Sequence, residues 1–233
     1  MPTRLWADGG YDTRDPKPPH EARVQDIVLN VVMIAIFLGI AFPVHEFSHA
    51  AAAYMRGDAT AKLFGRMTLN PIVHFDPMGG MLTVISILFS PFLFGWAKPT
   101  PINPANFRDR RNGEVIVSLA GPASNLIMAV LGAIVVRIII AAQIHIPDLL
   151  WTTLGYFVVF NVALAIFNLI PVPPLDGSAL LFRVLSPQQA WQIRPFLAQY
   201  GIFIVLGAVL LGGQVLGDVI YGISGFLMGV GLG

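Results

Sequence analysis

The sequence predicts an all-α polytopic membrane protein. We expect about five to six transmembrane helices, with a small re-entrant extended or β element between the first two core helices. Of the 233 residues, 55% are hydrophobic and only 12% are charged, whereas soluble domains average about 25% charged residues. The mean hydropathy is +0.71, and several apolar runs are long enough to span a bilayer.

Composition also excludes several classes of protein and of site. A formal net charge of +1 gives no sign of nucleic-acid binding, so we expect no nucleic-acid partner. The absence of cysteine excludes disulfides and thiolate ligands. A bound zinc ion would therefore be held by imidazole and carboxylate groups alone.

The chain divides into a tail and a single membrane domain. Residues 1–23 are rich in Pro, Asp, Arg and Lys and are predicted to form a flexible polar tail. Residues 24–233 are predicted to form one membrane-embedded domain. The first apolar segment, 27–55, follows the polar tail instead of opening the chain, so we expect no cleavable signal peptide. Pro43 should kink or locally unwind this helix.

The next stretch does not have the pattern of a spanning helix. Residues 62–69 alternate partly between apolar and polar side chains, which favours a strand, and Asn70-Pro71 predicts a turn. Residues 81–95 are apolar, but the run is short and Pro91 interrupts it. Residues 95–101 are predicted to form a second extended piece, and both pieces could present a strand edge to an extended peptide.

The second half of the chain contains clearer helices. Residues 115–142 and 149–169 predict transmembrane helices, and the prolines that follow, up to residue 174, forbid a continuous helix there. Such backbone at membrane depth needs protein or a water-filled cavity around it. Two further apolar stretches, 196–211 and 214–232, contain glycines spaced for close helix packing, which could support a homo-oligomer.

The segment His45-Glu46-Phe47-Ser48-His49 contains the clearest chemistry. Residues i and i+4 share one face of a helix, so both imidazoles can reach one metal ion. Glu46 then lies beside the metal, where it can take a proton from water. Ionisable groups inside a membrane helix are costly and therefore indicate function.

A catalytic zinc usually has three protein ligands, so a third ligand must come from elsewhere in the chain. Asp176 is the preferred candidate, because it follows the broken end of an apolar helix, where a carboxylate needs a partner. Water can satisfy His145 and Asp148 in their polar hinge. His74 and Asp76 remain candidates, although a pair that stabilises a turn is the more common role for such residues.

Three motifs in order resemble the site-2 protease family of intramembrane zinc metalloproteases, in a compact form without a PDZ domain. They are the HExxH box at 45–49, Ala120-Gly121-Pro122-Ala123-Ser124-Asn125, and Asn168 to Gly177, which is similar to NxxPxxPxDG. The likeness covers about residues 26–185, the catalytic core, and the C-terminal helices occupy about 190–232. Ser178 stands where the family often has a second glycine.

The resemblance implies a function and roles for individual residues. It implies one Zn²⁺ per chain, held by His45, His49 and Asp176, with Glu46 as the catalytic base and Asn168 near the developing oxyanion. It further implies hydrolysis of peptide bonds within or next to transmembrane segments of membrane protein substrates. The protein would be a multi-pass protein of the cell membrane.

The alternative is a non-catalytic metal-binding membrane protein, such as a transporter or a scaffold. A transporter needs ligands distributed along a path, and a scaffold does not need Glu46. Counts of basic residues leave the topology nearly tied. A shared metal requires an even number of crossings between His49 and Asp176, which predicts that 78–95 is re-entrant or lies along the membrane.

Overall fold

The computed structural model describes residues 28–29, 31–74, 76–79, 81 and 98–231, and this part of the chain is helical and contains no strand. Four of its helices are long and apolar enough to cross a membrane: Val31–Met55, Arg110–Ala141, Asp148–Asn168 and Pro187–Met228. The helical class expected from composition is thus confirmed. The expected tail, 1–23, and most of 78–95 lie outside the described residues, so the total of five to six spans stays a prediction.

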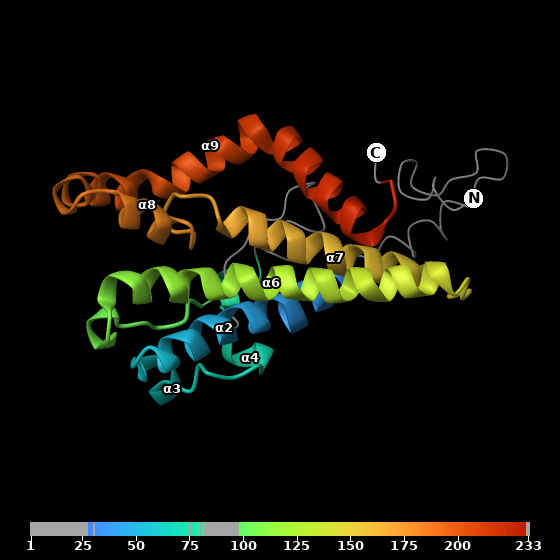
Figure 1. Cartoon of the computed structure of the whole chain (residues 1–233), viewed down its shortest axis with the longest axis horizontal. Coiled ribbons are helices and arrows are strands. Elements are labelled where there is room, and N and C mark those ends of the chain that lie inside the picture. Colours follow the sequence, from blue (N-terminus) through green and yellow to red (C-terminus); the bar gives the residue numbers. More distant parts are fainter. Residues whose placement is uncertain (1–27, 30, 75, 80, 82–97, 232–233) are drawn as a thin grey trace.

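Three helices form the centre of the molecule (Figure 1). Helix α6 (Arg110–Ala141) packs against α2 (Phe42–Met55) on one flank and against α7 (Asp148–Asn168) on the other. Residues buried between α6, α7 and the end of α9 (Pro187–Met228) are mostly small or β-branched: Ala129, Ala133, Val136, Val158, Val162 and Met228. Small side chains let membrane helices approach closely, and this approach fixes how α6, α7 and the end of α9 lie.

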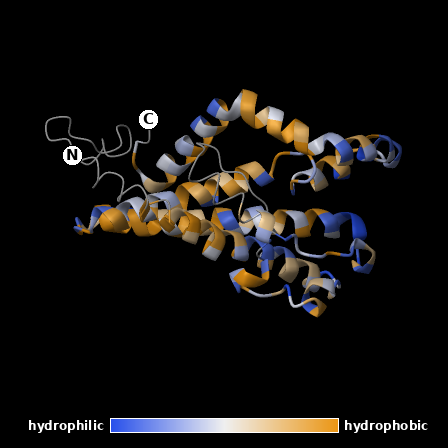
Figure 2. Cartoon of the chain, turned by 180° about the vertical axis from the view of Figure 1, so that it is seen from behind, coloured by the Kyte–Doolittle hydropathy of each residue, from blue (hydrophilic) through white to orange (hydrophobic). Residues whose placement is uncertain are grey.

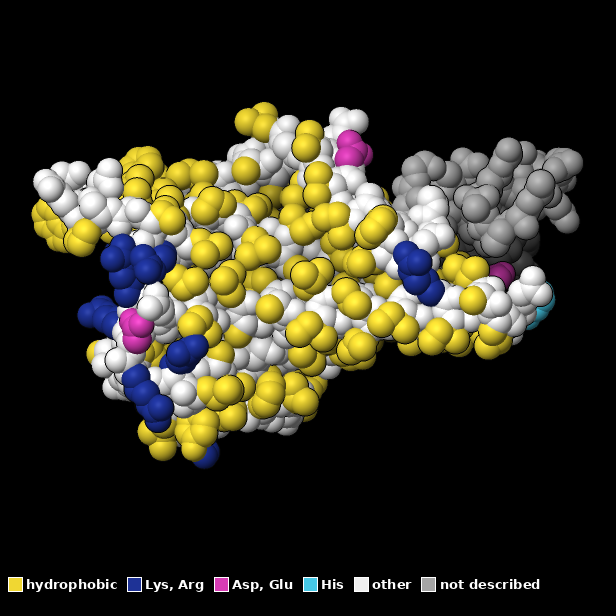
Figure 3. Space-filling model, in the orientation of Figure 1, with side chains coloured by type: hydrophobic (Ala, Val, Ile, Leu, Met, Phe, Trp, Pro, Cys, Tyr) yellow, Lys and Arg dark blue, Asp and Glu magenta, His cyan; other side chains and the backbone are white. Residues whose placement is uncertain are grey.

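The outer surface of the bundle is apolar (Figures 2 and 3). Large apolar side chains of α6 such as Ile127, Leu131 and Ile138 are exposed. A soluble helix bundle would bury such residues, whereas helices surrounded by lipid can expose them. The distribution agrees with four helices that cross a membrane.

The helix that contains the HExxH box is irregular just before it. A π-helical turn, η1 (Phe37–Ala41), precedes α2, and Pro43 occupies the first turn of α2. Proline has no N–H to offer the carbonyl four residues earlier, and a π turn is one way to accommodate that missing bond. The irregularity expected at Pro43 therefore takes the form of a widened turn in a continuous helix.

The strand predicted over 62–69 is wrong. Two short helices, α3 (Thr60–Leu63) and α4 (Pro71–His74), occupy this region. Asp58 accepts hydrogen bonds from the backbone N–H and the hydroxyl of Thr60, which stabilises the start of α3. Residues 98–103, within and after the second predicted extended piece, are non-helical, and η2 (Pro104–Asn106) follows them.

Chain segments on either side of 78–95 lie at the same end of the bundle. The N–H of Arg108 donates to the carbonyl oxygen of Arg56 at 3.1 Å, and the guanidinium of Arg111 donates to the carbonyl oxygen of Arg183 at 2.9 Å. Figure 3 shows most of the Lys and Arg side chains visible on this face gathered at this end. The end of α2, the start of α6 and α8 (Ser178–Val184) therefore share one end of the molecule.

The C-terminal stretches 196–211 and 214–232, predicted as two separate segments, belong to one helix. Helix α9 runs unbroken from Pro187 to Met228 and is bent in its middle (Figure 1). It begins at a capping box formed by Ser186 and Gln189. At Gly201 it approaches the proline-rich turn so closely that an added Cβ would lie 2.1 Å from the carbonyl oxygen of Pro173. Helix α9 thus covers the turn that leads to Asp176.

Candidate metal centre

The three predicted ligands converge although Asp176 is far from the histidines in sequence. His45 Nε2 and His49 Nε2 lie 3.0 Å apart, and each lies 3.2 Å from Asp176 Oδ2. Both histidines are buried, and Asp176 is 20% exposed. Among the described residues, these three form the one group of His, Asp and Glu side chains close enough to hold a metal ion.

Hydrogen bonds fix the protons of both imidazoles on the far side of this cluster. His49 Nδ1 lies 2.7 Å from the carbonyl oxygen of Val117, which can only accept, so Nδ1 is the donor. His45 Nδ1 lies 2.6 Å from Asn125 Oδ1. The amide group of Asn125 donates to Ala41 O and Asn161 Oδ1, which assigns Oδ1 as the acceptor for His45.

Neutral imidazoles in these tautomers therefore point two bare nitrogens and one carboxylate oxygen at a common centre. Asp176 Oδ2 is buried and accepts no hydrogen bond from any described residue. Three electron-pair donors at such distances repel one another unless a cation lies between them. Zn–N and Zn–O bonds of about 2.0–2.2 Å place tetrahedral ligand atoms roughly 3.3–3.5 Å apart, close to the distances seen here. The donor set thus fits zinc.

Gly121 of α6 makes room for the two histidines. A Cβ added there would lie 2.4 Å from His49 Nε2 and 2.7 Å from His45 Nε2, closer than any side chain tolerates. The next residue, Pro122, is buried inside the same helix. The sequence favoured close packing as the role of this Gly-Pro segment, and the packing partner is the histidine pair itself.

A tight turn after α7 positions Asp176. The N–H of Gly177 donates to the carbonyl oxygen of Asn168 at 2.6 Å, which folds the turn back onto the helix end. The turn brings Asp176 Oδ2 to 3.2 Å from the Nε2 atoms of both His45 and His49.

Glu46 is buried beside the histidines and is held by a segment that is distant in sequence. Its Oε2 accepts the N–H of Thr100 at 3.0 Å and the hydroxyl of Thr100 at 2.6 Å. In the described part of the chain, the donors to this carboxylate both go to Oε2, and none goes to Oε1. The carboxylate is therefore oriented through one oxygen while the other is free to accept a proton.

The remaining sequence candidates lie elsewhere. His74 is buried and contacts the carbonyl oxygen of Thr68, and Asp76 accepts the N–H of Gly79, so both act in local turns. His145 and Asp148 are exposed at the opposite end of α6 and α7. Asn168 is near the site in the chain, but its side-chain amide donates to the carbonyl oxygen of Leu164 in its own helix.

Sequence reasoning missed two residues that contribute to the site. Thr100 gave no signal, because its contact with Glu46 joins residues 54 positions apart. Asn161 could have been found, because a lone amide in the middle of an apolar helix usually has an interhelical partner. Asn161 is fully buried, and its Oδ1 accepts a hydrogen bond from the side-chain amide of Asn125. It therefore orients Asn125, whose own Oδ1 accepts the hydrogen bond from His45.

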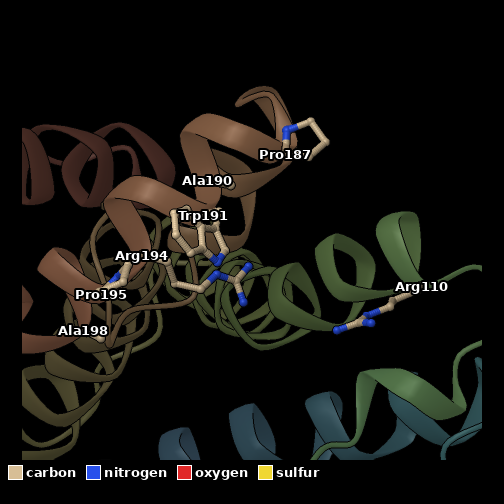
Figure 4. A pocket seen from close by; sticks show the side chains of 7 residues that line it. All are labelled: Arg110, Pro187, Ala190, Trp191, Arg194, Pro195 and Ala198. Carbon is tan, nitrogen blue, oxygen red and sulfur yellow. The ribbon is translucent and has the colours of Figure 1, made fainter.

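The cavity in Figure 4 is a separate feature. It has a volume of about 540 Å³ and lies between the starts of α6 and α9. Arg110, Trp191 and Arg194 line it, and its lining contains no histidine or carboxylate. This cavity therefore has no ligand for a metal ion and is not a candidate for the catalytic centre.

Comparison with known proteins identifies the class to which this fold and site belong. The profile of peptidase family M50 matches residues 135–211, which include Asp176. The Bacillus subtilis protein "Putative zinc metalloprotease YwhC" is 38% identical over 192 residues, which cover 78% of this chain and 83% of the relative. The chain belongs to peptidase family M50, the site-2 protease family.

Rip2 proteins, which are named in the same way, are also similar. Rip2 of Mycolicibacterium smegmatis is 33% identical over 164 residues, covering 70% of this chain and 60% of Rip2. Rip2 of Mycobacterium tuberculosis (strain H37Rv) is 29% identical over 175 residues, covering 74% of this chain and 65% of that protein. No solved structure matches the chain.

Proposed function

We propose that this chain is an intramembrane zinc metalloprotease that hydrolyses peptide bonds within or next to transmembrane segments of membrane proteins. The convergence of two bare imidazole nitrogens and the unpartnered oxygen of Asp176 at distances of 3.0–3.2 Å carries the proposal. Membership of family M50 and four apolar helices support it. The names of the relatives describe the same chemistry.

His45, His49 and Asp176 would hold one zinc ion per chain. Zinc supplies Lewis acidity, which polarises a peptide carbonyl and makes a bound water more acidic. Glu46 would accept the proton of the attacking water at Oε1 and deliver it to the leaving amine. Asn168 would aid the oxyanion only through an amide hydrogen that its bond to Leu164 leaves free.

The substrate would be a transmembrane segment in a lipid bilayer, because the site lies within apolar helices. A helical substrate must unwind first, since its backbone hydrogen bonds shield the scissile carbonyl. We assign the protein to the cell membrane. We also propose that 78–95 returns to the side from which it starts, an idea supported by the contact of Arg56 with Arg108.

A non-catalytic metal-binding protein is the less favoured alternative. Three ligands at one point are unlike the distributed ligands of a transport path. A structural metal site would not need a carboxylate beside the ligands that is anchored through one oxygen. Both features favour catalysis.

Metal removal tests the proposal directly. Purified protein in liposomes that contain a transmembrane substrate should cleave it, lose cleavage after chelation, and regain it on addition of about one equivalent of zinc. Asp176→Asn should lower the zinc content, because it removes the charged ligand oxygen. Cleavage that persists after complete removal of zinc would exclude the proposed chemistry.

A further inference from the structure

The segment Lys98-Pro99-Thr100-Pro101 lies directly against the proposed base. Thr100 offers two donors to one oxygen of Glu46, its N–H at 3.0 Å and its hydroxyl at 2.6 Å. The hydroxyl is also 3.3 Å from the backbone carbonyl oxygen of Glu46. Three contacts from one residue fix both the carboxylate and the backbone at the position of the base.

The sequence of this segment favours rigidity. The two prolines that flank Thr100 hold their φ angles near −65°, which limits how far the donors can move. The N–H of Lys98 donates to the carbonyl oxygen of His74 at 3.1 Å. Because proline has no N–H and the other two are engaged, these four residues have no free backbone donor.

This lack of donors argues against the expected role of the segment as an edge for an unwound substrate. Adding a strand needs alternating N–H and C=O groups on the exposed edge. Residues 98–101 can offer only carbonyl oxygens to a substrate. Their donors point instead to the protein itself, at Glu46 and His74.

A second anchor holds the same segment from its other end. Asp58 is fully buried and accepts the N–H of Asn103 at 2.7 Å and the side-chain amide of Asn106 at 2.8 Å. The N–H of Arg108 bonds to the carbonyl oxygen of Arg56. Hydrogen bonds therefore hold the chain from 98 to 108 at both of its ends. Thr100 bonds to Glu46 of α2, and the far end bonds to Asp58 and Arg56, which directly follow α2.

We propose that Thr100 is a positioning residue for Glu46: it holds Oε2 so that Oε1 is the oxygen that exchanges protons during peptide hydrolysis. Preorganisation of this kind lowers the barrier because the base needs no reorientation at the moment of reaction. The proposal rests on the proposed function, because it assigns a role within that reaction. A positioning role for Thr100 predicts an effect on kcat, whereas a role in substrate binding would predict an effect on KM.

The experiment compares Thr100→Val, which keeps the shape and removes the hydroxyl, with Thr100→Ser, which keeps the hydroxyl. Thr100→Val should lower kcat roughly ten- to a hundredfold, the loss expected for one charge-assisted hydrogen bond, with KM and zinc content nearly unchanged. Thr100→Ser should stay within about threefold of the unmodified protein. Thr153→Val, whose hydroxyl donates to the Leu149 carbonyl away from the site, is the control and should have no effect.

A second measurement does not depend on proteolysis. If the contact exists, Thr100→Val should lower the melting temperature in the unmodified background and have a smaller effect when Glu46→Ala has already removed the acceptor. Equal shifts in both backgrounds would overturn the contact. An unchanged kcat in Thr100→Val, a loss equal in Thr100→Ser, or a loss confined to KM would overturn the positioning role. Absence of cleavage by the unmodified protein would instead contradict the proposed function.

Discussion

His45 and His49 face each other through their Nε2 atoms at 3.0 Å, although neither atom has a proton to share. Their protons are on Nδ1, where Asn125 and Val117 accept them. The arrangement holds both lone pairs toward Asp176 and costs free energy unless a cation neutralises it. The protein thus maintains a site whose geometry suits a metal ion.

Gly121→Ala should abolish zinc binding and activity. The new methyl group would lie 2.4 Å from His49 Nε2, so at least one imidazole must leave its position. Zinc content of the purified variant and substrate cleavage are the measurements. Gly207→Ala is the control, because nothing lies within 4 Å of a Cβ there. Full zinc occupancy in Gly121→Ala would show that the histidines do not occupy the positions described.

Asn125→Leu should weaken zinc binding by roughly ten- to a hundredfold, the range found when partners behind metal ligands are removed. The variant leaves His45 Nδ1 without its acceptor and breaks the bonds to Ala41 and Asn161. Competition with a chelator of known affinity measures the change. Asn112→Leu, at an exposed asparagine of the same helix, should leave the affinity intact. Equal affinities in the two variants would count against a role for Asn125.

Asp58 should make the stability of the protein depend on pH in the acidic range. Burial raises the pKa of its carboxyl, but hydrogen bonds from Thr60, Asn103 and Asn106 outweigh this and lower the pKa below its usual value. A lowered folded-state pKa stabilises the fold above the unfolded value of about 3.9, and this contribution is lost as pH falls through the folded value.

Melting temperatures of the unmodified protein and of Asp58→Asn measure this contribution. The unmodified protein should be the more stable near pH 7, and the difference should shrink below about pH 4 as Asp58 gains its proton. A difference that stays constant down to pH 3 would show that the charge of Asp58 is not what holds the segment.

Cysteine labelling should place both sides of 78–95 on one face of the membrane. The chain has no native cysteine, so Leu63→Cys and Ala105→Cys introduce single reporters at exposed positions before and after 78–95, and Gln143→Cys marks the opposite end. A membrane-impermeant reagent should label residues 63 and 105 from the same side and residue 143 from the other. Labelling of 63 and 105 from opposite sides would mean that the chain crosses the membrane between α2 and α6.

The grouping of His45, His49 and Asp176 could be predicted from sequence because these residues stand out locally. His45 and His49 share a helix face, and Asp176 follows a helix end broken by prolines, where an unpaired carboxylate is costly. The hold of Thr100 on Glu46 could not be predicted. It is a contact between two segments that are distant in sequence, and neither segment has a periodic pattern that indicates a contact with the other.

The two errors in secondary structure have different physical causes. Partial alternation over 62–69 predicted a strand, yet the chain forms α3 and turns there, and Leu63 (83% exposed) and Phe64 (71% exposed) do not form a buried face. The glycines between 211 and 214 predicted a break, yet α9 continues through them. In a bilayer, breaking a helix leaves backbone groups without partners, so a bend is less costly than a break.

Glu46→Gln tests the central claim most directly. The variant keeps the size and an oxygen that Thr100 can reach but removes the proton acceptor, so zinc content should stay near one ion per chain while cleavage of a transmembrane substrate falls below detection. Zinc content and cleavage are measured on the same preparation. Retained hydrolysis with zinc bound would contradict the assignment of Glu46 as the base.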